Sequence, residues 1–198
     1  MKLGRDFFMQ DTKKVAKQLL GKKLWHITQE GITAGIIVET EAYLGERDGA
    51  AHTHRGKSER TRVAYEDSGR AYIYLIYGMY CCFNITSGER GVPEMVLLRA
   101  LEPCEGTEVM MLRRNTDRVV NLCSGPGKLC KALQITRDMY GHDLCESETF
   151  FITDDGFRPK GIAVSRRIGI DYAKEAREYP LRFFIKDNKY VSKVLKTK

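Results

Sequence analysis

The chain has 198 residues, of which 42% are hydrophobic and 30% are charged, and its formal net charge is +7. This length fits one domain, and the composition is that of a water-soluble globular protein. The sequence has no run of about 18 or more apolar residues and no apolar leader, so we expect a cytoplasmic protein without membrane contacts. The basic balance favours a polyanion such as nucleic acid as partner, although an ordinary basic enzyme can carry a similar charge.

Cysteine usage and chain organisation are simple. The six cysteines form no C-x-x-C pair and no zinc-binding spacing, so we interpret them as reduced thiols, mostly in the core. There is no internal repeat, low-complexity tract or obvious linker. We therefore predict a single domain over residues 1–198.

The first third of the chain predicts one helix followed by two strands. Asp11 is a helix N-cap candidate, and the helix should end near Gly21. Residues 23–28 and 32–43 are typical of strands joined by a tight turn. The stretch 46–69 is polar and charged with few anchors for a core, and so long a loop is usually functional or disordered.

The remaining elements are mostly strands. Residues 72–85 are too long for one strand, so we predict a hairpin with a tight turn at Tyr77-Gly78-Met79. After it we predict, in order, strand 95–101, helix 107–114 capped by Thr107, a helix opening at 125–128 and reaching Leu133, strands 161–168 and 181–185, and a solvated tail over 186–198. The fold class is therefore α+β: a mostly antiparallel β-sheet core with flanking helices and a protruding β-hairpin.

Two carboxylates and an aromatic ring alternate along strand 32–43. Glu39, Glu41 and Tyr43 should share one face, while Val38 and Ala42 lie on the other. A carboxylate beside aromatic groups can serve as a general base. A pair of surface carboxylates, or two metal ligands, would give the same pattern.

Two further groups carry chemistry in more than one interpretation. Arg99 lies inside an apolar run and needs a partner if it is buried; Glu41 is a candidate, with or without a catalytic role. His52 and His54 resemble half a metal site, but no third ligand is evident, and a plain loop position explains them as well.

The segment around Tyr72 and Tyr74 is rich in tyrosine. Such residues usually form a sheet face, yet tyrosine also stacks well on nucleic-acid bases. Tyr77, at the predicted hairpin tip, would suit a wedge inserted into DNA. The segment 125–128 combines backbone N–H groups with a lysine, which suits a phosphate or a simple helix cap.

Taken together, these motifs resemble the alkyladenine (3-methyladenine) DNA glycosylase family. The matching segments run in family order across nearly the whole chain: 38–45, 50–52, 72–80, 84–85, 96–103, 125–129, 167–170 and 180–183. One departure precedes the hairpin. Where the family often has Met-Phe and a Pro-Gly turn, this chain has Ala64-Tyr65 and Ser68-Gly69.

The resemblance implies a monofunctional glycosylase of base excision repair. Such an enzyme flips alkylated or deaminated purines (3-methyladenine, 7-methylguanine, hypoxanthine, ethenoadenine) out of double-stranded DNA and hydrolyses the N-glycosidic bond, leaving an abasic site. It also implies a fold like the C-terminal domain of methionyl-tRNA formyltransferases, no metal and no other cofactor. We expect a monomer, since an enzyme that scans DNA can act alone.

By the same resemblance, Glu41 would activate the attacking water and Arg99 would position both. The remaining roles would be base binding by Tyr43, His52, Tyr74 and Asn84, intercalation by Tyr77 and Met79, and backbone contacts by Arg55, Lys128 and Arg167. Two alternatives stay open. One is a non-catalytic nucleic-acid-binding module; the other is a metal-dependent nuclease using Glu39, Glu41, Asp48 and His52, which EDTA would inhibit.

Overall fold

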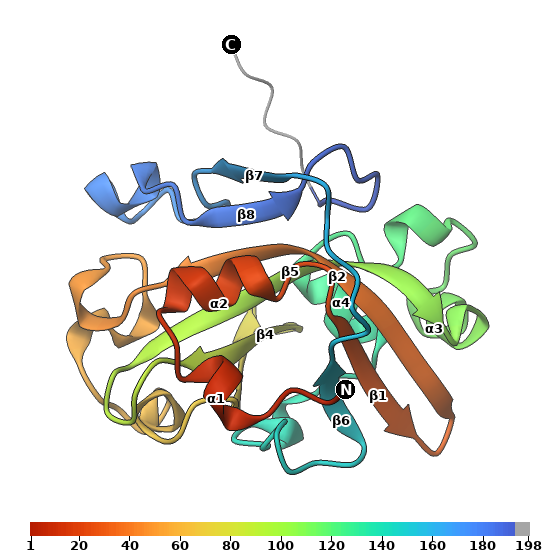
Figure 1. Cartoon of the computed structure of the whole chain (residues 1–198), viewed down its shortest axis with the longest axis horizontal. Coiled ribbons are helices and arrows are strands. Elements are labelled where there is room, and N and C mark those ends of the chain that lie inside the picture. The colour runs from red at the N-terminus through yellow and green to blue at the C-terminus, as the bar shows by residue number, and fades with distance from the viewer. Residues whose placement is uncertain (193–198) are drawn as a thin grey trace.

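A curled antiparallel β-sheet organises the computed structural model, which describes residues 1–192 (Figure 1). The strand order is β3-β4-β5-β2-β1-β6, with β8 paired to β2 and β7 to β8. The strands are β1 Lys23–Thr28, β2 Gly31–Tyr43, β3 Ala71–Ile76, β4 Tyr80–Ser87, β5 Glu94–Glu105, β6 Phe150–Thr153, β7 Ile162–Ser165 and β8 Arg182–Ile185. The prediction of an α+β fold is confirmed, while the likeness to the formyltransferase domain stays a prediction.

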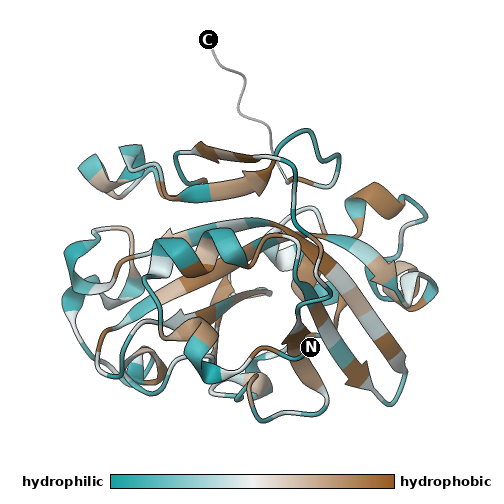
Figure 2. Ribbon diagram, in the orientation of Figure 1, coloured by the Kyte–Doolittle hydropathy of each residue, from teal (hydrophilic) through white to brown (hydrophobic). Residues whose placement is uncertain are grey.

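Short helices cover the sheet. They are α1 Arg5–Phe8, α2 Thr12–Gln18, α3 Thr107–Arg114 and α4 Pro126–Ala132. The Asp11 side chain caps α2 by accepting from the Lys14 N–H, as predicted, and Thr40 on β2 donates a hydrogen bond to the α2 carbonyl of Ala16. Figure 2 shows hydrophobic residues gathered on the strands and hydrophilic ones on α2 and the outer loops. The core therefore lies between the sheet and its helices.

Strand β2 is the centre of the fold, because it pairs with β1, β5 and β8. Its register against β5 shifts on both sides of Glu39. Such bulges bend a strand and re-aim a side chain. Val38 and Ala42 enter the main core, whereas Glu39 and Glu41 both reach Arg99. The predicted division of β2 into an apolar and an acidic face is confirmed.

The tyrosine-rich segment forms the predicted hairpin. Strands β3 and β4 meet at a turn in which the Met79 N–H donates to the Ile76 carbonyl. Tyr77 and Gly78 have φ of 53° and 72°, and positive φ at both central residues is the mark of a type I′ hairpin turn. Tyr77 and Met79 are 83% and 68% exposed. The hairpin tip thus presents two large apolar side chains to solvent.

Two local predictions need correction. The stretch 46–69 is a long loop as predicted, with short 3-10 helices at Gly45–Arg47, His52–Arg55 and Arg62–Tyr65, but it does have core anchors, because Val63 and Ala64 are buried against the hairpin. Helix α3 begins with Thr107, but Gly106 is its N-cap and no side chain caps it. A Cβ at Gly106 would collide with the carbonyl oxygen of Ile32, and its φ is 66°. Close packing against β2 therefore requires glycine at the N-cap of α3.

The C-terminal segment is not a free tail as far as it is described. Tyr190 is buried in the main core, and Ser192 donates two hydrogen bonds to Glu39. The prediction of a solvated tail is wrong for 186–192, while 193–198 lie outside the described residues. Strand β6 and helix α1 were not predicted. No helix within residues 1–192 is long and apolar enough to cross a membrane.

Candidate active site

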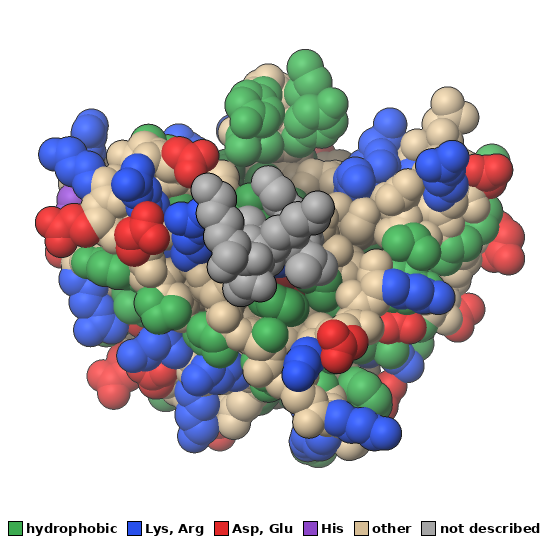
Figure 3. Space-filling model, turned by 90° about the horizontal axis from the view of Figure 1, so that it is seen from above, with side chains coloured by type: hydrophobic (Ala, Val, Ile, Leu, Met, Phe, Trp, Pro, Cys, Tyr) green, Lys and Arg blue, Asp and Glu red, His purple; other side chains and the backbone are tan. Residues whose placement is uncertain are grey.

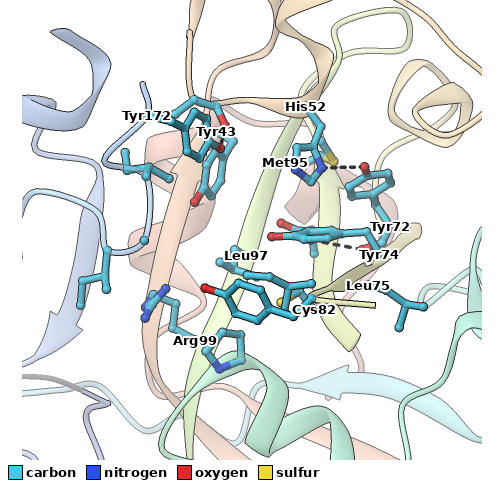
Figure 4. A pocket seen from close by; sticks show the side chains of 18 of the residues that line it. Tyr43, His52, Tyr72, Tyr74, Leu75, Cys82, Met95, Leu97, Arg99 and Tyr172 are labelled. Atoms are coloured by element: carbon cyan, nitrogen blue, oxygen red, sulfur yellow. Dashed lines mark hydrogen bonds between the residues drawn. The ribbon is translucent and has the colours of Figure 1, made fainter. Parts of the chain in front are cut away.

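An aromatic pocket of about 540 Å³ opens between the end of β2, the β3–β4 hairpin and the loop after β7. This volume is typical of small-molecule sites. In Figure 4, Tyr43 and Tyr172 lie on one side of the space, and His52, Tyr72 and Tyr74 lie on the other. The pocket therefore has the shape and lining to hold a flat ring.

Glu41 lies behind the pocket wall and is completely buried. Its Oε1 accepts a hydrogen bond from the Ile168 N–H at 2.8 Å and lies 3.4 Å from Nη1 of Arg99. Its Oε2 accepts from the Tyr43 hydroxyl at 2.8 Å. A carboxylate has about four lone-pair sites, so these three donors leave room for one more, such as that of a water molecule.

Arg99 links the two carboxylates of β2. Its Nε donates to Glu39 Oε1 at 3.0 Å while its Nη1 faces Glu41. Arg99 also lines the pocket, so one residue connects the pocket with both carboxylates. The predicted pairing of Arg99 with Glu41 is present, and Glu39 is an additional partner.

Tyr43 is clamped from behind by Arg167. The Arg167 guanidinium lies 4.6 Å from the centre of the Tyr43 ring and binds both oxygens of Asp48, at 2.5 and 2.8 Å. Burial, with the nearby charge of Glu41 second, raises the pKa of Tyr43 well above its usual range, so its hydroxyl stays a donor.

The predicted DNA-backbone contact of Arg167 is contradicted by this geometry. Its side chain has no exposed surface, and both of its Nη atoms are occupied by Asp48 and by backbone carbonyls of Ala42 and Ala176. A phosphate cannot reach a guanidinium in that position. Arg167 is a positioning residue beneath Tyr43.

His52 is a neutral hydrogen-bond donor toward the pocket. Its Nδ1 lies 2.8 Å from the Tyr72 hydroxyl and 3.4 Å from Nη2 of Arg60. Because a guanidinium can only donate, Nδ1 must accept, and the ring proton sits on Nε2. Burial, helped by the charge of Arg60, lowers the pKa of His52 to about 4. Near neutral pH the imidazole therefore offers one N–H donor.

Tyr74 and Asn84 come from the two hairpin strands and line the same space. The Tyr74 ring packs edge-on against His52 at 4.4 Å between centroids. Burial raises the pKa of Tyr74 far above its usual value. Asn84 donates to the Tyr72 carbonyl at 3.3 Å. The structure thus brings Tyr43, His52, Tyr74 and Asn84 into one pocket.

The remaining predicted residues lie outside the pocket floor. Tyr77 lines the pocket edge from the hairpin tip. Arg55 and Lys128 are exposed, and Lys128 Nζ lies 3.3 Å from the Ser124 hydroxyl. Figure 3 shows Lys and Arg side chains spread over the face seen from above, with acidic ones between them. The positive charge is distributed rather than gathered in one patch on that face.

Several site residues were not assigned from sequence. Tyr72 orients His52, and its place among the hairpin tyrosines was the available signal. Arg60 covers Tyr74 and contacts His52 from a polar loop that gives no pattern. Tyr172 lines the pocket and donates to the Ala50 carbonyl. The Ile168 N–H acts through the backbone, which side-chain patterns do not reveal.

Comparison with known proteins now identifies the family. Residues 6–189 match the sequence profile of the family described as methylpurine-DNA glycosylase. The chain belongs to this glycosylase family. A protein from Desulfitobacterium hafniense (strain Y51), named "Putative 3-methyladenine DNA glycosylase", is 42% identical over 200 residues that cover 96% of this chain and 98% of that protein.

Other relatives carry the same name. The protein from Alkaliphilus oremlandii (strain OhILAs) is 45% identical and covers 98% of this chain and all of its own length. That from Methanocella arvoryzae is 46% identical and covers 96% of each chain. As a member of this family, the protein is a DNA repair enzyme that acts on DNA, and the resemblance seen in the sequence is confirmed.

Three of the four residues of the alternative metal-nuclease site form ion pairs with arginines. Glu39 and Glu41 are paired with Arg99, and Asp48 with Arg167. Within residues 1–192 there is no cluster of three His, Cys, Asp or Glu side chains suited to a metal ion. The carboxylates of β2 thus face guanidinium groups.

Proposed function

We propose that this glycosylase is monofunctional and that it hydrolyses the N-glycosidic bond of damaged purines flipped from duplex DNA, with Glu41 as general base. The observation that carries the proposal is the placement of Glu41. It is buried behind an aromatic pocket and held by Arg99, the Ile168 N–H and the Tyr43 hydroxyl. Base flipping brings a bond that is out of reach inside the duplex to such a site.

The chemical step needs a water molecule and a place for its proton. Water attacks the sugar C1′, the N-glycosidic bond breaks, and the base leaves with the bonding electron pair. Glu41 takes the water proton and stabilises the oxocarbenium-like sugar. Arg99 holds the carboxylate and orients the water. A cationic base such as 3-methyladenine leaves as a neutral molecule and needs no proton.

The pocket lining supports a preference for flat, electron-poor rings. Tyr43 and Tyr74 would stack on the two faces of the base, since electron-rich rings favour a cationic partner. His52 offers its Nε2–H to an acceptor on the base, and Asn84 at the floor would disfavour the exocyclic amine of normal guanine. We propose 3-methyladenine, 7-methylguanine, hypoxanthine and ethenoadenine as substrates.

The hairpin supplies the means of flipping. Tyr77, supported by Met79, would fill the space left in the duplex by the extruded nucleotide, because both side chains are exposed at the tip. Among the described residues that line the pocket none is a lysine, which supports simple hydrolysis over a Schiff-base lyase step. We expect the enzyme to act as a monomer.

The deciding experiment measures base release from a duplex that holds one hypoxanthine, in EDTA, with wild type and Glu41→Gln. We expect strand breaks only after alkali and only with wild type, while both proteins bind DNA equally. Breaks without alkali would indicate a lyase, and breaks that appear only when EDTA is left out would indicate a metal nuclease. Methylated DNA serves as the second substrate. If Glu41→Gln releases base from both substrates as fast as wild type, Glu41 is not the general base.

Arg55 and Lys128 remain proposed contacts to the DNA backbone. Replacing either with Gln should reduce the slope of log binding constant against log salt by about one. Arg158→Gln is the matched control, because this exposed arginine pairs with Asp154 and does not line the aromatic pocket, so the slope should stay unchanged. An unchanged slope for Arg55 or Lys128 would remove that residue from the interface.

A further inference from the structure

Glu39 is a buried carboxylate for which the proposed reaction has no role. Its side chain has no exposed surface, and it lies between the register shifts of β2. Oε1 accepts from Nε of Arg99 at 3.0 Å and from Nε of Arg182 at 2.7 Å. Ser192 donates its backbone N–H to Oε2 at 2.6 Å and its hydroxyl to Oε1 at 3.0 Å. Four donors from three separate segments therefore converge on one side chain.

The geometry of Arg99 gives these contacts a consequence for catalysis. Its Nε is directed to Glu39 and its Nη1 to Glu41, so two carboxylates on one strand face fix the guanidinium plane. If Glu39 lost its charge, Glu41 would be the one charged partner of Arg99 left on β2. Arg99 would then move onto Glu41 and occupy the lone pair that the attacking water needs.

The segment that carries Ser192 is itself firmly held. Asn188 donates to Glu102 on β5 at 2.9 Å, and its own Oδ1 accepts from the Tyr190 N–H. Tyr190 packs in the main core. The segment that carries Ser192 is thus anchored on β5 and in the core, and these anchors place Ser192 beside Glu39.

We propose that Glu39 and Ser192 form a positioning pair that holds Arg99 in the orientation needed for water activation. This inference rests on the proposed role of Glu41 as the base. Neither residue touches substrate. The pair acts through Arg99, because Glu39 fixes the guanidinium from behind and Ser192 fixes the Glu39 carboxylate.

Ser192→Ala gives the first test, since it removes one donor and leaves the backbone N–H in place. We expect the single-turnover rate of base release to fall about threefold to tenfold, the weight of one ordinary hydrogen bond, because Ser192 acts only through Glu39 and Arg99, with unchanged affinity for lesion DNA. Ser165→Ala is the matched control: it removes a hydroxyl that contacts Arg182 but not Glu39, and its rate should stay near wild type. An unchanged rate for Ser192→Ala would overturn the proposal.

Glu39→Gln provides the second test. We expect a loss of about 100-fold in the single-turnover rate, as for a misplaced catalytic group, while DNA affinity is kept. In a double-mutant cycle, Ser192→Ala should have no further effect in the Glu39→Gln background. Additive effects, or a fall in DNA affinity that matches the fall in rate, would overturn the proposal.

The two proposals fail in different ways. If Glu41→Gln is active, the proposed function fails. If Glu41→Gln is inactive but Ser192→Ala and Glu39→Gln release base at the wild-type rate, only the positioning pair fails. Should Glu39→Gln not fold, the comparison of Ser192→Ala with Ser165→Ala still decides.

Discussion

Arg167 binds both carboxylate oxygens of Asp48 directly beneath the ring of Tyr43. The two charged side chains are 0% and 1% exposed. Burial alone would raise the pKa of Asp48, but its hydrogen bonds with Arg167 and the charge of that residue lower it. The pair fastens the loop after β7 to the end of β2, where the stacking ring begins.

Breaking this ion pair should be costly. Asp48→Asn leaves the buried Arg167 charge without a counterion, and we expect the free energy of unfolding to fall by about 3–5 kcal/mol. Urea denaturation at pH 7 measures it. Glu178→Gln, which removes an exposed partner of Arg166, is the control and should cost no more than about 1 kcal/mol. Equal losses in the two variants would show that burial does not govern the pair.

The Tyr43 hydroxyl can be separated from the Tyr43 ring. Tyr43→Phe keeps the stacking surface but removes the donor to Glu41. We expect lesion-DNA affinity to stay near wild type and the single-turnover rate to fall by about tenfold, as for a lost hydrogen bond to a carboxylate. Tyr43→Ala should reduce both. If Tyr43→Phe weakens DNA binding as much as Tyr43→Ala, the hydroxyl and not the ring determines affinity.

His52 predicts a stability change on the acid side of neutrality. Its pKa is about 4 in the folded protein and about 6.5 in an unfolded chain. Between these values the unfolded state binds a proton that the folded state does not, so stability is complete above pH 6.5 and falls as the pH drops toward 4. Urea midpoints at pH 7 and 4.5 should differ less in His52→Asn than in wild type.

The exposed His54 gives the control for that measurement. His54→Asn should keep the acid-side loss of stability that comes from His52, because it leaves the buried His52 ring and its contact with Tyr72 in place. NMR titration of the imidazole signals provides an independent reading. A His52 signal that titrates near pH 6.5 would contradict the buried, neutral ring.

We expect Tyr77 to lower the stability of the fold and to be needed for base release. A non-glycine residue at a φ of 53° is strained, so Tyr77→Gly should raise the free energy of unfolding by about 1 kcal/mol. The same change removes the wedge and should strongly reduce base release from duplex DNA. Tyr77→Phe keeps the ring and the strain, and we expect wild-type activity. Full activity of Tyr77→Gly would exclude Tyr77 as the intercalating residue.

Features set by neighbouring residues could be predicted from the sequence. The period-2 pattern of β2 predicted which side chains share a face, and Gly78 marked the hairpin turn. The Asp11 cap was equally local. Glu41, Tyr43, His52, Tyr74 and Asn84 were assigned by family resemblance, and the fold brings them to one place.

Partners distant along the chain could not be predicted. Arg167 meets Asp48 across 119 positions, and Ser192 meets Glu39 across 153. A basic residue in a loop carries the same sequence signal whether it binds phosphate or a buried carboxylate, which is why Arg167 was misassigned. Likewise, the polar stretch around Val63 hid its core contacts, because one or two apolar residues form no period.

The contact between Glu39 and Ser192 can form only late in synthesis. A ribosome delivers the hairpin and the aromatic pocket wall long before it releases residue 192, since chains emerge from the N-terminus. A nascent or proteolytically shortened chain that lacks this segment keeps the contacts of Arg99 with Glu39 and Glu41, but its Glu39 carboxylate has lost the two donors that Ser192 supplies. If Ser192 positions Arg99 through Glu39 as proposed, we expect an incomplete chain to release bases more slowly than one that includes residue 192.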